Sequence, residues 1–200
     1  NLSNGILHAS KENDASEIIV GLHIRATQDE SFFGPVLLNL LNKMDRQIMI
    51  LHAATPINRV HNIHVAIPEN AEYEAGFYRW TKTLSLIQAY LQRYHTSVLY
   101  EMQETDGGNE LKRLSTELQP DDLMVIIMAR HGSVSFRPSL EHVPHQINAY
   151  YTDKNFILLF PDSYAPASPE LTFVELHGTR GTYEKKKGWL DFLWKKEEQN

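Results

Sequence analysis

The polar loop at residues 130–135 carries the side chains of this sequence best suited to chemistry. It reads Arg-His-Gly-Ser-Val-Ser and directly follows the apolar run "MVIIMA". A guanidinium, two hydroxyls and a glycine amide are groups that bind phosphate or another anion. Open α/β sheets bind such ligands outside the carboxyl ends of their strands, where this loop is expected to lie. Arg130, Gly132, Ser133 and Ser135 are therefore candidate anion-binding or nucleotide-binding residues.

The same loop has a second interpretation, as an ordinary connection between a strand and a helix. Serine side chains often cap helices or bond to nearby main-chain amides in turns. We favour the turn. The sequence also contains no P-loop, no Rossmann glycine fingerprint and no GxSxG motif. We expect no catalytic residues and no enzyme activity.

Ten histidines raise the question of a metal site. His61 and His64 lie three residues apart on an expected strand, so their side chains point to opposite faces. His142 and His145 are separated by Pro144, which argues against a shared helical face. Because the chain has no cysteine and no HExxH motif, we expect no metal site.

Short apolar runs define the elements that must position these residues. There are six of strand length: Ile18–Leu22, Ile48–Leu51, Ile63–Ile67, Val98–Met102, Leu123–Met128 and Phe156–Phe160. Most are apolar on both alternating faces, which is typical of strands covered by helices on both sides.

Apolar residues at helical spacing lie between these runs. Three helices are predicted: one over Val36–Met44 with Pro35 in its first turn, one bearing Tyr73, Phe77, Trp80, Leu84, Ile87, Leu91 and Tyr94, and one with Leu111, Leu114 and Leu118. Strands that alternate with helices predict an α/β fold, a layered, largely parallel sheet with flanking helices.

The composition excludes some functions. The 200 residues are 42% hydrophobic and 22% charged, as in globular domains, and the net charge of −6 argues against nucleic-acid binding. No apolar run approaches the roughly 18 residues of a membrane-spanning helix. Since the chain opens at Asn1 instead of a methionine, we expect it to be a fragment of a longer polypeptide.

The order strand, arginine, Ser-Phe loop, helix and strand occurs twice along the chain. This repeat predicts that residues 1–55 are the C-terminal half of one unit and residues 56–162 a second, more complete unit. Residues 163–200 would then be a linker and a C-terminal amphipathic tail.

The tail has an aromatic face flanked by lysines. Trp189, Phe192 and Leu193 share this face, and Trp194 lies beside it. Such a segment can lie at a membrane surface, or it can pack against this domain or a dimer partner. We favour protein contact, and both alternatives remain open.

Three stretches resemble one family: "SEIIVGLHIRATQDESFFG", "HVAIPENAEYEAGFYRW" and "PDDLMVIIMARHGSVSFRPSLEHVP". The chain resembles tandem universal stress protein-like (adenine nucleotide alpha hydrolase-like) domains, and more specifically the C-terminal region of bacterial cation:proton (sodium/hydrogen) antiporters. The resemblance covers most of residues 1–160. It implies a non-catalytic regulatory or structural domain on the cytoplasmic side of the inner membrane, attached to a transmembrane antiporter domain of the same polypeptide. A homodimer is a further implied partner.

The resemblance also brings an alternative function, a freestanding universal stress protein that binds an adenine nucleotide. Members that bind nucleotide use two glycines three residues apart and a later Gly-Ser or Gly-Thr. Here Gly21 lacks the second glycine, Gly34 is followed by Pro35, and Pro138-Ser139 replaces the later Gly-Ser. Gly21 and Gly34 stay candidates, but this degraded motif leads us to expect no cofactor.

Overall fold

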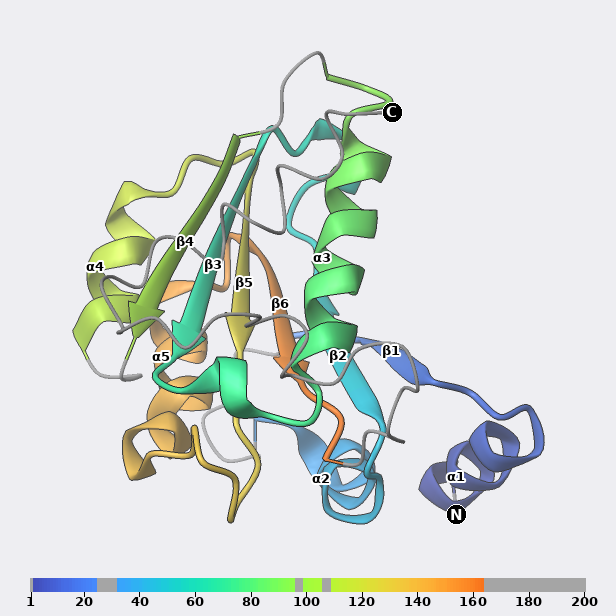
Figure 1. Ribbon diagram of the computed structural model, residues 1–200. Coiled ribbons are helices and arrows are strands. Elements are labelled where there is room, and N and C mark those ends of the chain that lie inside the picture. Colours follow the sequence, from blue (N-terminus) through green and yellow to red (C-terminus); the bar gives the residue numbers. More distant parts are fainter. Residues whose placement is uncertain (1, 25–31, 96–98, 106–108, 164–200) are drawn as a thin grey trace, which may run out of the picture. The chain divides into compact units, whose positions relative to one another are not determined.

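The computed structural model describes residues 2–24, 32–95, 99–105 and 109–163 (Figure 1). Residues Asn1–Ala165 form one compact unit. The elements in chain order are α1 (Leu2–Glu12), β1 (Glu17–Gly21), α2 (Gly34–Lys43), β2 (Gln47–His52), η1 (Ile57–Arg59), β3 (Asn62–Pro68), η2 (Ala71–Tyr73), α3 (Phe77–Leu91), β4 (Leu99–Thr105), α4 (Asn109–Glu117), β5 (Asp122–Ile127), η3 (Pro138–His142), α5 (Val143–Tyr150) and β6 (Asn155–Phe160).

All six predicted strands are present, and they form one sheet in the order β1-β2-β6-β5-β3-β4. Four of the five neighbouring pairs are parallel, and β2 pairs antiparallel with β6. The predicted α/β fold with a largely parallel sheet is therefore confirmed. The antiparallel pair joins strands from the two predicted units, so β2 completes its sheet on the edge of β6.

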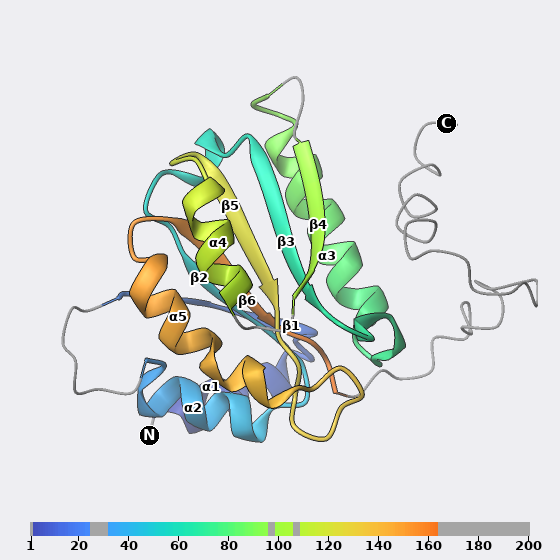
Figure 2. The same cartoon turned by 90° about the vertical axis from the view of Figure 1, so that its left-hand side faces the viewer.

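The helices cover both faces of the sheet, as Figures 1 and 2 show from two sides. On one face, α3 places Trp80 and Leu84 on a core that includes Val65 and Val125. On the other face, α1, α2, α4 and α5 pack over a second core that includes Ile126. This double coverage explains why β5 and β6 are buried at every position.

The helix expected over residues 73–94 is shorter, because α3 covers only Phe77–Leu91. The prediction was wrong at both ends: Tyr73 lies in η2 with 45% exposure, and Tyr94 follows the helix with 52% exposure. The cause at the first end is Gly76, where a Cβ would lie 2.7 Å from the backbone N and O of Asp162. The chain turns there to let the two backbones approach.

Two further helices differ from the expectation. The prediction included no helix at the start of the chain, where α1 lies, and Ile6 and Leu7 pack against the core from there. Pro144 does not prevent a helix, because it occupies the first turn of α5, where a missing N–H costs no hydrogen bond. His142 lies just before this helix.

Within the described ranges, no helix combines the length and the apolar character needed to cross a bilayer.

Candidate functional site

The loop that follows β5 lies at the topological switch point of the sheet. β3 and β5 are parallel neighbours, and the chain leaves their carboxyl ends in opposite directions, toward β4 and toward β6. Ligands of open α/β sheets bind in the crevice at such a point. Residues 69–76 follow β3 and residues 128–137 follow β5, and a hydrogen bond between Glu74 and Ser135 joins the two segments.

Ser135 is bound to a carboxylate of the protein itself. Its backbone N–H and its hydroxyl both donate to Oε1 of Glu74, at 2.7 and 2.5 Å. Ser135 is 1% exposed, and Glu74 reaches it from the short segment between η2 and α3. A bound phosphate oxygen would accept hydrogen bonds from these same two donors. The Glu74 carboxylate therefore occupies the position that an external anion would take.

Arg130 is equally occupied. Its Nε donates to Pro161 O at 2.8 Å, and its Nη1 donates to Leu41 O and Met44 O at 3.1 and 2.7 Å. Its Nη2 donates to Arg46 O at 2.8 Å. Four of its five N–H groups thus hold the C-terminal end of α2 and the end of β6 together.

The position of Arg130 follows from the geometry of a helix end. The last carbonyls of α2 have no partner within the helix and carry the negative end of its dipole, which favours a cation there. Burial lowers the pKa of Arg130, while the carboxylates of Asp162 and Asp45 act in the opposite direction. An arginine guanidinium keeps its proton in proteins, so Arg130 stays charged near pH 7.

The remaining loop residues form consecutive turns. Gly132 has a φ of 84°, which favours glycine, and Ser133 N donates to Arg130 O at 3.1 Å. Phe136 N then donates to Ser133 O at 3.2 Å. The Ser133 hydroxyl oxygen is buried and has no hydrogen-bond partner within the described residues. This geometry favours the turn over the phosphate site.

The structure does not bring Gly21 to this loop. Gly21 ends β1, which is parallel to β2, and β2 is antiparallel to β6. The carboxyl end of β1 therefore lies at the opposite edge of the sheet from that of β5. Gly34 begins α2 with a φ of 65°, and its neighbour Phe33 lines a cavity that Arg130 also lines.

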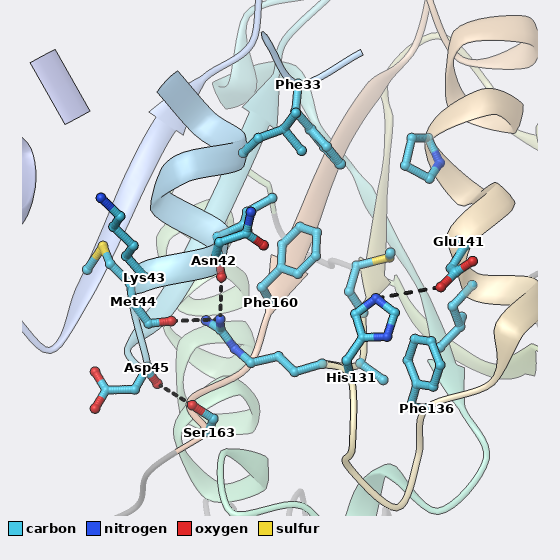
Figure 3. A pocket seen from close by; sticks show the side chains of 17 residues that line it. Phe33, Asn42, Lys43, Met44, Asp45, His131, Phe136, Glu141, Phe160 and Ser163 are labelled. Carbon is cyan, nitrogen blue, oxygen red and sulfur yellow. Dashed lines mark hydrogen bonds and ion pairs between the residues drawn. The ribbon is translucent and has the colours of Figure 1, made fainter. Parts of the chain in front are cut away.

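That cavity has a volume of about 610 Å³ and lies beside the loop, between α2 and α5 (Figure 3). Its apolar wall consists of Phe33, Leu38, Leu41, Met44, Met128, Phe136, Leu140, Pro144 and Phe160. The rings of Phe33 and Phe160 meet edge to face with centroids 6.0 Å apart. His131 stacks on Phe136 at 4.4 Å and pairs with Glu141 at 3.5 Å.

A buried carboxylate near this loop was not predicted from the sequence. The Asp162 side chain is 2% exposed, and one of its oxygens accepts a hydrogen bond from Arg79 of α3. Burial raises the pKa of Asp162, and the Arg79 guanidinium opposes that rise. The sequence offers one signal for this contact, the isolated Gly76 just before a helical pattern.

The other predicted sites give no ligand geometry. Among the residues that the structure describes, no three histidine, aspartate or glutamate side chains are arranged to hold a metal ion. His64 lies 3.3 Å from Asp122, a carboxylate that also accepts from Asn62. Trp189, Phe192, Leu193 and Trp194 lie outside the described residues.

Comparisons with known proteins add a remote structural likeness. No protein-family model matches the chain, and no curated protein matches it. A solved structure, that of the functionally unknown protein PA1789 from Pseudomonas aeruginosa PAO1, is similar with a TM-score of 0.48 and 13% identity. The match covers 81% of this chain and 69% of that one.

Proposed function

We propose that this chain is a non-catalytic regulatory or structural domain of a bacterial cation:proton antiporter, with a universal stress protein-like fold. In this proposal it lies on the cytoplasmic side of the inner membrane, joined to the transmembrane domain of the same polypeptide. The resemblance of residues 1–160 to the C-terminal region of such antiporters supports the assignment. Ion translocation itself needs ionisable groups on membrane-spanning helices, so this domain would act on transport and not perform it.

One observation supports the proposal that this domain does not bind a nucleotide: the hydrogen bonds between Ser135 and Glu74. Both Ser135 donors end on one carboxylate oxygen, at 2.7 and 2.5 Å. A phosphate would have to displace an anion that is covalently part of the protein and is therefore present at a high effective concentration. A freestanding nucleotide-binding stress protein is accordingly the weaker alternative.

A transport assay tests the proposal. The full reading frame would be expressed in cells without other sodium/proton exchangers, and dissipation of a pH gradient by added cations would be measured in everted vesicles. A protein that stops before Asn1 should still exchange cations for protons, but with an altered dependence on pH or cation concentration. A reading frame that encodes no membrane spans, or a truncation with unchanged dependence, would contradict the proposal.

A further inference from the structure

The cavity between α2 and α5 has the features of a ligand site, and it shares Arg130 and Phe136 with the loop after β5. Its 610 Å³ lies within the range of roughly 300–1,000 Å³ typical of small-molecule pockets. The floor is buried, with Met44 at 6%, Met128 at 5% and Leu140 at 1% exposure. Leu38 is 37% exposed at the cavity. An apolar ligand would remove this side chain from water without any rearrangement of the floor.

The charge at the cavity indicates what the other end of the ligand should be. Arg130 lines the cavity, and its guanidinium contacts four main-chain carbonyls. Among the described residues, no carboxylate lies within ion-pair distance of it. One Nη2 hydrogen is left without an acceptor in these contacts. Carbonyl dipoles at the end of α2 offset only about half a charge, so part of the positive charge of the half-buried Arg130 remains for an anion.

The acidic residues at the cavity do not cancel this charge. The Glu141 side chain is 56% exposed, so water screens its charge. Asp162, a carboxylate that acts on Arg130 from outside the cavity lining, is paired with Arg79. Asp45 is exposed to solvent, where water screens its attraction for Arg130. Lys43, in the last turn of α2, adds a second positive charge to the lining.

We propose that this cavity binds an amphipathic carboxylate, a molecule with one anionic end and an apolar body of medium length. The apolar body lies between α2 and Phe136, and the carboxylate faces Arg130. This site does not depend on the antiporter proposal, because it rests only on the lining of the cavity.

Sodium octanoate and sodium decanoate, below their micellar concentrations, are the probes. Binding would be followed by NMR of ¹³C-labelled methionine methyl groups in the 200-residue protein. The Met44 and Met128 methyl signals should shift saturably, whereas Met49, which packs in the core on the other face, should not. Each added methylene should lower the Kd about four-fold.

Charge controls separate this ligand class from others. 1-Decanol should bind at least about ten-fold more weakly than decanoate, since it lacks the charge that Arg130 attracts. Decyltrimethylammonium should not shift Met44 or Met128. Equal affinity for the alcohol or the cation would overturn the anionic assignment, and the absence of any saturable shift would overturn the site.

A pair of variants tests the location. Leu38→Glu places a negative charge at the cavity and should weaken decanoate binding at least about ten-fold. Leu86→Glu changes a residue that is 61% exposed on α3, on the other side of the sheet, and should leave the Kd unchanged. If both variants bind decanoate like the wild type, or both lose binding equally, the assignment to this cavity is wrong.

Discussion

Replacement of Arg130 by methionine tests whether the loop after β5 is a structural turn. Methionine keeps much of the apolar stem and removes the four hydrogen bonds to main-chain carbonyls. Two of these carbonyls belong to buried residues, Met44 and Pro161, and an orphaned buried acceptor costs about 1–3 kcal/mol. Removal of a partly buried charge returns some desolvation energy. We expect the free energy of unfolding to fall by about 3 kcal/mol.

The assay is urea denaturation followed by far-ultraviolet circular dichroism. Arg130→Lys keeps the charge but cannot reach all four acceptors. Its free energy of unfolding should therefore lie between those of the wild type and Arg130→Met. Arg137→Met is the matched control, because this arginine is 40% exposed and donates to carbonyls of its own loop, those of Val134 and Phe136. Its ion pair with Glu69, at 3.6 Å, is exposed to solvent, and such pairs contribute little to stability. The free energy of unfolding of Arg137→Met should differ from that of the wild type by no more than about 0.5 kcal/mol. If Arg130→Met is as stable as Arg137→Met, the hydrogen bonds of Arg130 do not stabilise the fold.

Three further changes have expected outcomes. Gly76→Ala should lower the free energy of unfolding, measured in urea, by about 1–3 kcal/mol, because its Cβ would lie 2.7 Å from the Asp162 backbone. The control is Gly5→Ala in α1, where a Cβ meets nothing within 4 Å and should stabilise the protein slightly. Tyr151→Phe should lower the free energy of unfolding by about 1–2 kcal/mol, because it removes the 2.7 Å hydrogen bond to Leu111 O. Burial raises the pKa of Tyr151, and ultraviolet titration of the folded protein should show that this tyrosine ionises above the ordinary pKa of tyrosine. Burial raises the pKa of Asp162, so this group favours folding most below its ordinary value of 3.8, and that contribution is lost as pH rises through the folded value. The free energy of unfolding of wild type minus that of Asp162→Asn should therefore fall between pH 3 and pH 7, and a rise would contradict this.

The sequence predicted the strands well because burial on both faces leaves an unmistakable pattern. β5 and β6 are apolar at every position after their first residues, Asp122 and Asn155, and the structure buries every residue in both strands. The antiparallel pairing of β2 with β6 was not predictable in this way. Both strands are apolar, and an apolar pattern does not encode the direction of a neighbour.

The candidate loop was located correctly at a strand end, but its contacts could not be predicted. Glu74 and Ser135 are 61 residues apart in sequence, and nothing in the local sequence distinguishes Glu74 from its neighbours Glu69 and Glu72. The role of Arg130 was equally hidden, because its acceptors are backbone carbonyls at and after the end of α2 and after β6, which any sequence would supply. Such long-range contacts depend on the packing of the whole fold.

The helix ends show how tertiary contacts override periodicity. Tyr73 and Tyr94 continue the apolar spacing of α3, yet both are exposed and lie outside the helix. The close approach of Asp162 to Gly76 imposes the turn before Phe77. Periodicity therefore identified α3 but not the residues at which it begins and ends.

Isothermal titration of the 200-residue protein with magnesium ATP tests the central claim most directly. That claim is that the donors of the loop after β5 are bound internally, with Ser135 on Glu74 and Arg130 on main-chain carbonyls. It predicts no saturable heat up to about 1 mM ATP, the concentration at which even weak sites of about −4 kcal/mol would be half occupied. One-site binding with a Kd below about 100 μM would contradict the claim and favour a nucleotide-binding protein.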